Sequence, residues 1–80
     1  MIVTVKLFAI AADLANSQTV EVDLTDDTVA DLRRVLAEKC PALARVLPHF
    51  LFAINSQYAT DASVIPADAD IACIPPVSGG

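Results

Sequence analysis

The chain has 80 residues, and its only two glycines are the last two, Gly79 and Gly80. At an average usage of about 7%, roughly five or six glycines would be spread along a chain of this length. Residues without a side chain can enter a channel too narrow for any other residue, and here they end in a carboxylate. The carboxyl group of Gly80 is therefore the first candidate for a reactive group.

The four residues before these glycines are Pro75, Pro76, Val77 and Ser78. Because proline has no amide hydrogen, Pro75 and Pro76 end any sheet pairing and stiffen the exit of the chain. Six extended residues reach about 20 Å. We therefore expect a folded domain over residues 1–74 and an extended tail over residues 75–80 that presents the terminal carboxylate. The alternative is an ordinary frayed terminus.

The other ionisable residues form no catalytic pattern. The closest carboxylate pairs, Asp26-Asp27 and Asp68-x-Asp70, fall in turn-like sequence, where aspartate commonly bonds the backbone or faces water. His49, the only histidine, follows a proline in an expected loop, and no nucleophile and acid are arranged around it. General acids and bases need buried, tuned sites, so we expect no catalytic role for these residues.

Two cysteines, Cys40 and Cys73, form neither a CxxC motif nor a His/Cys cluster that could bind a metal ion. Cys40 precedes Pro41 at a helix end and Cys73 lies in an apolar run, so we expect both to be small buried hydrophobic residues. The absence of glycine before Gly79 also excludes a P-loop and a dinucleotide-binding fingerprint. We expect that the chain binds no cofactor of its own and is not an enzyme by itself.

The composition excludes several classes of protein. Ten acidic and five basic residues give a net charge of −5, whereas a nucleic-acid binder or a ligand of anionic membranes needs a basic patch. The apolar fraction of 55% supports one packed core, and no apolar run approaches the ~20 residues of a membrane span. We expect a single cytoplasmic domain.

Hydrophobic periodicity indicates the elements that must position the tail. Strands are predicted at Ile2–Ala9, Val20–Leu24, Phe50–Ile54, Gln57–Thr60 and Ile71–Ile74. Residues 13–18 are polar and turn-prone, with room for one helical turn. This order predicts an α+β domain of the ubiquitin-like β-grasp type, with a mixed sheet of four or five strands packed on one main helix.

The main helix is predicted to begin after Thr28, whose hydroxyl can accept the amide hydrogen of Asp31, and to end at Pro41. One apolar stripe is expected to face the sheet and comprises Val29, Leu32, Val35 and Leu36. The solvated side is expected to carry Asp31, Arg34 and Glu38.

The segment Ile74-Pro75-Pro76-Val77-Ser78-Gly79-Gly80 resembles the C-terminus of the small subunits of molybdopterin synthase, which are sulfur carriers of the ubiquitin-like group. Further matches are Leu7-Phe8-Ala9, Thr28-Val29-x-x-Leu32 and Ala53-Ile54-Asn55. The chain departs from the family at Ala12-Asp13, where Arg-Glu is frequent, and at Ala67-Asp68, where an Asp-Gly turn is frequent.

The resemblance implies a mechanism in which partners supply the catalytic groups. An adenylating enzyme would activate the Gly80 carboxylate with ATP and Mg, and a sulfur donor would convert it to a thiocarboxylate. The tail, including Val77, Ser78 and Gly79, would then enter the large subunit of molybdopterin synthase and pass its sulfur to cyclic pyranopterin monophosphate.

We also expect a docking surface beside the exit of the tail. Phe8 interrupts the polar face of the first strand, Tyr58 follows the middle turn, and Ile74 points away from Ile71 and Cys73 by strand parity. We predict that Phe8, Tyr58 and Ile74 form one exposed apolar patch, since such patches commonly mark partner sites.

Three other functions remain open at this point. A thiamine-pathway sulfur carrier shares the fold and the Gly-Gly end, although the Pro-Pro-Val-Ser run favours the molybdopterin branch. A ubiquitin-like modifier would join the Gly80 carboxyl group to lysines through the same activation chemistry. A binding module with an idle tail would work without Gly80.

Overall fold

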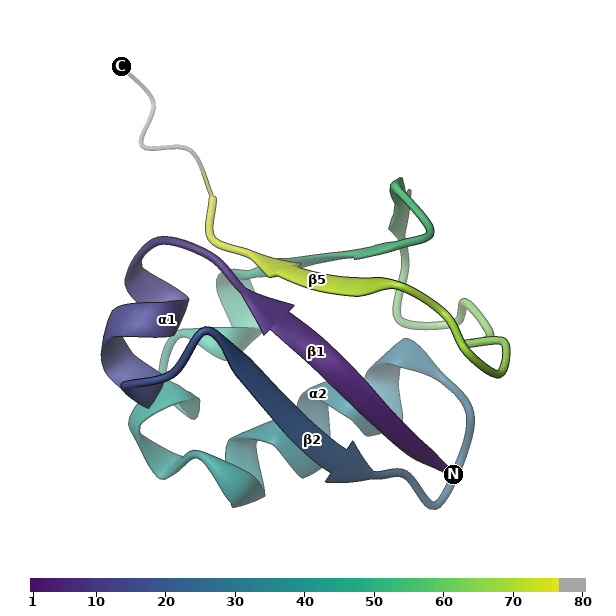
Figure 1. Ribbon diagram of the computed structural model, residues 1–80, viewed down its shortest axis with the longest axis horizontal. Coiled ribbons are helices and arrows are strands. Elements are labelled where there is room, and N and C mark those ends of the chain that lie inside the picture. The colour runs from purple at the N-terminus through teal and green to yellow at the C-terminus, as the bar shows by residue number, and fades with distance from the viewer. Residues whose placement is uncertain (77–80) are drawn as a thin grey trace.

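Five strands form one mixed sheet in the order β2-β1-β5-β3-β4, and the helix α2 lies across one face of it (Figure 1). A computed structural model describes residues 1–76. The strands are β1 (Ile2–Leu7), β2 (Thr19–Asp23), β3 (Leu51–Ile54), β4 (Gln57–Ala59) and β5 (Ile71–Ile74). The helices are α1 (Ile10–Ala15), α2 (Val29–Lys39), and the short 3-10 turns η1 (Pro41–Leu43) and η2 (Leu47–His49).

The inner strand β1 pairs with β2 in antiparallel and with β5 in parallel orientation. Its side chains alternate as predicted, with Val3, Val5 and Leu7 buried against α2 and the intervening residues exposed. Because Val5 lies opposite both Val20 and Ile71, the middle of the core is formed by three adjacent strands. The α+β architecture with a mixed sheet of five strands is confirmed.

The first strand is shorter than predicted, and the segment after it is more helical. Strand β1 ends at Leu7, because Phe8 to Ala11 form a tight turn in which the Ala11 amide donates to the Phe8 carbonyl oxygen at 3.1 Å. Ala9 occupies this turn with φ 52° and ψ −127°, a conformation that favours glycine. Helix α1 then runs from Ile10 to Ala15, so it starts before the polar segment 13–18 in which we expected room for one helical turn.

Helix α2 begins as predicted, with the Asp31 amide donating to the Thr28 hydroxyl oxygen at 3.2 Å. Val29, Leu32 and Leu36 are fully buried. The assignment of Asp31 to the solvated side was wrong, because this carboxylate is 7% exposed and accepts hydrogen bonds from the backbone amides of Thr25 and Asp26. A carboxylate in the first helical turn can turn back and bind the amides of the preceding loop, which hydrophobic periodicity does not register.

Arg33 joins α2 to the segments that precede β3 and follow β4. Its guanidinium donates to the carbonyl oxygens of Leu47 and Phe50 and pairs with Asp61 at 3.0 Å. The same group lies 5.0 Å from the centre of the Phe52 ring, a cation–π contact. The start of β3 is therefore held against the helix by one side chain.

The turn between β3 and β4 positions the start of β5. Asn55 and Ser56 both have positive φ, at 50° and 69°, as a two-residue hairpin turn requires. The Asn55 side-chain oxygen accepts from the Asp70 amide at 2.9 Å, and the Asn55 amide donates to the Asp70 carbonyl oxygen at 2.8 Å. In residues 1–76 no helix is long and apolar enough to cross a membrane.

Candidate functional site

Strand β5 is the middle strand of the sheet, and the chain leaves the sheet after its last residue, Ile74 (Figure 1). Pro75 is half-buried and Pro76 is exposed, and neither belongs to a strand. The remaining tail residues that we assigned to partner binding and to chemistry, Val77, Ser78, Gly79 and Gly80, lie outside the described residues. Their roles therefore stay predictions.

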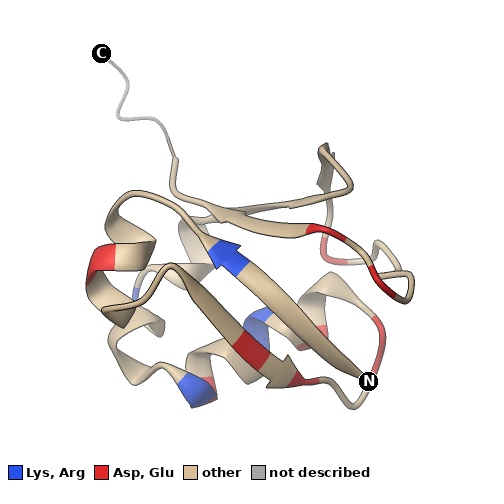
Figure 2. Cartoon of the chain, viewed as in Figure 1, with Lys and Arg blue, Asp and Glu red and all other residues tan. Residues whose placement is uncertain are grey.

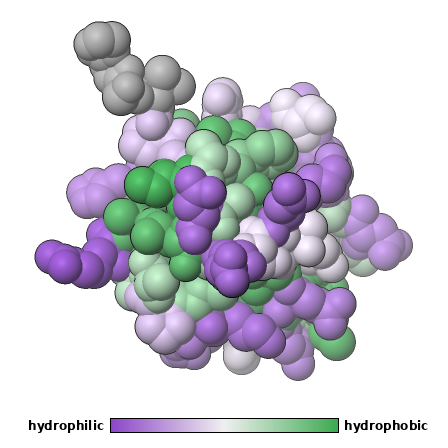
Figure 3. Space-filling view, turned by 60° about the vertical axis from the view of Figure 1, so that its left-hand side comes forward, coloured by the Kyte–Doolittle hydropathy of each residue, from purple (hydrophilic) through white to green (hydrophobic). Residues whose placement is uncertain are grey.

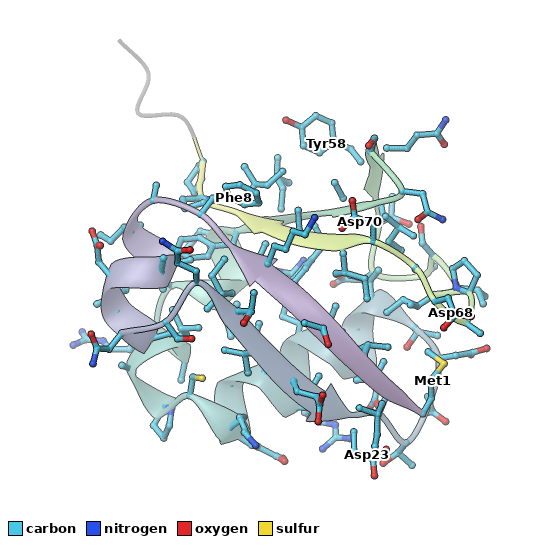
Figure 4. All side chains as sticks on the ribbon, in the orientation of Figure 1. Met1, Phe8, Asp23, Tyr58, Asp68 and Asp70 are labelled. Atoms are coloured by element: carbon cyan, nitrogen blue, oxygen red, sulfur yellow. The ribbon has the colours of Figure 1, made fainter. Side chains whose placement is uncertain are left out.

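The structure brings Phe8, Tyr58 and Ile74 around one surface hollow of about 340 Å³. Phe8 is 48% exposed and Tyr58 is 73% exposed, while Ile74 is half-buried. Figure 4 shows Phe8 and Tyr58 on the side of the sheet from which the chain leaves. The three residues line the same hollow, although Ile74 is less exposed than we predicted, and their role in binding a partner stays a prediction.

The floor of this hollow is a row of residues that crosses four strands. Lys6 of β1 lies opposite Ala72 of β5, Ala72 lies opposite Ala53 of β3, and Ala53 lies opposite Tyr58 of β4. Two methyl groups thus stand between two long side chains, which is why the sheet is hollowed here. Our sequence reasoning missed both alanines, although strand parity places Ala72 on the same face as Ile74.

The rim of the hollow is polar on the side away from Ile74. The Lys6 ammonium group lies 3.1 Å from the Asp70 carboxylate, and both side chains are more than half exposed. Such an ion pair contributes little to stability because water screens it.

In Figure 2 most acidic segments lie at the end of the sheet opposite the exit of the chain. Figure 3 shows hydrophobic surface gathered in the upper half of the face in view, interrupted by hydrophilic residues.

The remaining candidate residues show no catalytic arrangement. Cys73 is fully buried, and burial raises the pKa of its thiol to about 11, so this sulfur is protonated at neutral pH. Cys40 is half-buried at the end of α2, and His49 is exposed. Within residues 1–76 no group of His, Cys, Asp and Glu side chains could hold a metal ion.

The helix packed on a five-stranded mixed sheet, with a chain exit beside an exposed apolar hollow, defines a ubiquitin-like β-grasp protein. A family model described as the ThiS family matches residues 5–80. The chain belongs to the ThiS family.

Individual relatives span the whole chain. The Molybdopterin synthase sulfur carrier subunit of Caenorhabditis briggsae is 33% identical over 81 residues, covering 98% of this chain and 96% of that protein. The crystal structure of SAMP1, small archaeal modifier protein 1, from Haloferax volcanii superposes with a TM-score of 0.85, at 36% identity and full coverage of both chains.

A third neighbour is a structure of two proteins together. It is the complex of subunits 1 and 2 of Molybdopterin-converting factor from Helicobacter pylori 26695, with a TM-score of 0.68 and 20% identity over the full length of both chains. At this identity the match shows the shared fold alone.

Proposed function

We propose that this chain is the sulfur-carrying small subunit of a molybdopterin synthase. The observation that carries the proposal is the 33% identity to a protein named Molybdopterin synthase sulfur carrier subunit, over 98% of this chain. That match covers nearly the whole of both proteins, and the ThiS family model extends to residue 80. The terminal Gly79-Gly80 pair supplies the group that such a carrier needs.

The chemistry begins with activation of the Gly80 carboxylate. A carboxylate oxygen attacks the α-phosphorus of ATP, which forms an acyl-adenylate and releases pyrophosphate in a Mg-dependent partner enzyme. Sulfide (HS⁻) from a sulfur donor then attacks the acyl carbon and displaces AMP, which leaves a thiocarboxylate and one proton. The adenylate is needed because a free carboxylate lacks an adequate leaving group.

The thiocarboxylate sulfur next bonds to a carbon of cyclic pyranopterin monophosphate in the large subunit of the synthase, and hydrolysis of the resulting thioester restores the Gly80 carboxylate. The carrier contributes the sulfur and the recognition surface, and the large subunit contributes the catalytic groups. Cys73, the only thiol in β5, is buried and protonated and is therefore a poor nucleophile. This agrees with a carrier whose catalytic groups lie on its partners.

The test is the intact mass of the carrier after incubation with its activating enzyme, ATP, Mg and a sulfur donor. Replacement of one terminal oxygen by sulfur raises the mass by about 16 Da, the difference between the two atomic masses. Deletion of Gly80 should abolish the increase, whereas a Cys40→Ala variant should retain it. An unchanged mass in the wild-type protein would contradict the proposal, provided that a known carrier shifts under the same conditions.

A protein-modifier function is the second candidate, and one observation favours it. SAMP1 of Haloferax volcanii, a small archaeal modifier protein, is 36% identical over the full length of both chains. In this function a lysine amine, rather than a sulfur donor, would displace AMP from the Gly80 acyl-adenylate and form an isopeptide bond. A ladder of slower-migrating bands that disappears on deletion of Gly79 and Gly80 would support it.

The identity of the protein that co-purifies with this chain distinguishes a molybdopterin-pathway carrier from a thiamine-pathway carrier. We expect the synthase large subunit to be recovered with this chain. Recovery of a thiazole synthase in its place would support the thiamine-pathway alternative. Both outcomes would leave the activation chemistry at Gly80 intact.

A further inference from the structure

We propose that Arg33 is a positioning residue for activation of the Gly80 carboxylate, because it fixes the end of β5 through the start of β3. This inference rests on the proposed function. It assigns a role to a side chain of α2 that belongs neither to the tail nor to the exposed patch.

Only β3 holds the last residue of β5. On the side of β1, the pairing ends where the Phe8 amide donates to the Cys73 carbonyl oxygen at 3.3 Å. The next residue of the chain that faces β1 is Pro75, which has no amide hydrogen. On the side of β3, Ile74 lies opposite Leu51. The backbone of Ile74 is therefore paired with β3 alone.

The Leu51–Ile74 pair is also the last hydrogen-bonded pair before the tail. The Asn55 amide donates to the Asp70 carbonyl oxygen at 2.8 Å, and bonded and non-bonded pairs alternate along an antiparallel ladder. This alternation makes Leu51–Ile74 a bonded pair. Pro76, the next residue facing β3, has no amide hydrogen to continue the ladder.

Arg33 fixes the point at which β3 begins. Its Nη1 atom donates to the carbonyl oxygen of Phe50 at 2.8 Å and to that of Leu47. Phe50 directly precedes Leu51, which pairs with the last residue of β5. On the other side of Leu51, the guanidinium lies over the Phe52 ring, 5.0 Å from its centre. One side chain thus contacts the residues before and after Leu51.

Loss of these contacts should loosen the end of β5 without unfolding the sheet. The Arg33 side chain is 21% exposed, and a charged donor of this kind makes stronger hydrogen bonds than a neutral one. Without it, the start of β3 lacks its link to α2. Ile74 would then open more often, since a strand end paired on one side alone opens at low cost.

A loosened end of β5 should affect activation of the carboxylate rather than docking. The position of Ile74 determines where the chain begins its path toward the active site of the activating enzyme. When that position varies, fewer bound carriers present the Gly80 carboxylate to ATP, and productive geometry is lost even though the complex forms. We therefore expect kcat to fall while KM changes little.

The first experiment measures amide hydrogen exchange of the intact chain by NMR. Arg33→Met keeps the apolar stem but removes every donor, so the Ile74 amide should exchange at least about tenfold faster, the usual effect of losing a hydrogen bond to a charged group. The Val5 amide, in the middle of β1, reports global unfolding. Acceleration of Val5 without acceleration of Ile74 would overturn the proposal.

Arg34→Met is the matched control. Arg34 is the adjacent residue, and its hydrogen bonds end on Asp31 and Glu38 of the same helix. Its loss should destabilise the protein and accelerate Val5, but leave exchange at Ile74 unchanged, because local opening of β5 breaks no contact of Arg34. Equal acceleration of Ile74 in both variants would show that it exchanges by global unfolding, and the proposal would fall.

Two further variants keep the test valid if Arg33→Met does not fold. Asp61→Ala removes the ion pair of Arg33 but leaves both of its carbonyl acceptors, so Ile74 should exchange as in wild type. Arg33→Lys keeps a charge on a side chain that lacks the planar fork, and Ile74 should exchange faster than in Asp61→Ala. The reverse order would assign the effect to the ion pair and overturn the proposal.

The second experiment measures initial rates of thiocarboxylate formation against the concentration of carrier, with the activating enzyme, ATP, Mg and a sulfur donor. Arg33→Met should lower kcat at least about threefold and leave KM within about twofold of wild type, as expected for lost positioning. Partial unfolding would instead raise the apparent KM at constant kcat, because it only removes competent carrier. Faster exchange at Ile74 with an unchanged kcat would overturn the positioning role.

Failure of this proposal and failure of the proposed function give different results. If wild type gains sulfur and Arg33→Met matches it in both experiments, the function stands and the positioning role falls. If wild type never gains sulfur although Arg33→Met accelerates exchange at Ile74, Arg33 still fixes the end of β5 and the sulfur-carrier function fails.

Discussion

The backbone amide of Phe8 donates a hydrogen bond to the carbonyl oxygen of Cys73 at 3.3 Å. This bond extends the β1–β5 pairing one residue beyond Leu7, the last residue of β1. It therefore holds the Phe8 ring beside Ile74, at the point where the chain leaves the sheet. Phe8 is therefore positioned both by a sheet hydrogen bond to β5 and by the turn that leads to α1.

Truncation of the exposed aromatic residues tests the docking patch. We expect Phe8→Ala and Tyr58→Ala each to weaken binding of the large subunit by about tenfold or more, because aromatic residues at the centre of an interface contribute about 1–2 kcal/mol or more. Calorimetric titration of the large subunit with each purified variant measures the effect.

Ile2→Ala provides the control for these variants. Ile2 is 65% exposed and lies on β1 as an outward-facing residue, but at the end of the strand far from the tail exit. Its truncation should leave affinity unchanged. Equal losses from Ile2→Ala and Phe8→Ala would show that binding does not depend on the patch near the tail.

The buried carboxylate of Asp31 predicts a pH dependence of stability. Hydrogen bonds from the Asp26 amide and from the Arg34 guanidinium hold the pKa of this carboxyl below its ordinary value of 3.8. Since the folded pKa is lowered, the stabilisation is fully present above pH 3.8 and is lost as the pH falls through the folded value. We expect Asp31→Asn to lower the melting temperature at pH 7.

The difference between Asp31→Asn and wild type should shrink as the pH is lowered, because the wild-type carboxyl then also loses its charge. Asp27→Asn is the matched control, since Asp27 is exposed in the same loop. It should change the melting temperature little at either pH. A difference between Asp31→Asn and wild type that stays constant from pH 7 down to pH 2 would contradict the role of the ionised carboxylate.

The conformation of Ala9 predicts a stabilising substitution. With φ at 52°, the Cβ atom of Ala9 crowds the backbone, and glycine removes this clash. After the entropy that glycine adds to the unfolded chain is subtracted, Ala9→Gly should raise the free energy of unfolding by about 1 kcal/mol. Urea denaturation measures this change.

Ala44→Gly is the control for this substitution. Ala44 is exposed and has φ −56° and ψ −37°, where alanine is unstrained. Glycine there should destabilise the protein by roughly 0.5–1 kcal/mol, because only the unfolded chain gains freedom. If both substitutions changed stability in the same direction, strain at Ala9 would not be the cause.

The two thiols should differ in reactivity toward iodoacetamide. Cys73 is fully buried with a pKa raised to about 11, whereas Cys40 is half-buried. Because the thiolate is the reactive species, the native protein at pH 8 should take up one label, at Cys40, and a second only after unfolding. Peptide mass spectrometry locates the labels, and rapid labelling of Cys73 in the folded protein would contradict its assignment as an inert core residue.

Hydrophobic periodicity predicted the buried faces of the elements well. Alternation placed Val3, Val5 and Leu7 on the core side, and the helical repeat placed Leu32 and Leu36 against the sheet. These predictions succeeded because the direction of a side chain follows from its position in a strand or a helix, whatever the neighbours are.

The errors fell where polar groups or turns override this local rule. Asp31 was assigned to the solvated side of α2, but its carboxylate turns inward because it accepts hydrogen bonds from the backbone amides of Thr25 and Asp26. The strand was extended through Ala9 because no glycine marks the turn after Leu7. Asp68 likewise takes a positive φ of 60° although it is not a glycine.

By itself the sequence determined the side of each strand that is buried, the start and end of α2, and the exit of the chain after Ile74. Only the tertiary structure decided that Phe8, Tyr58 and Ile74 surround one hollow and that Ala53 and Ala72 form its floor. The physical reason is that β5, the last strand in the chain, pairs between β1 and β3. Side-chain direction is a local property, whereas the choice of neighbouring strand depends on pairing between distant segments.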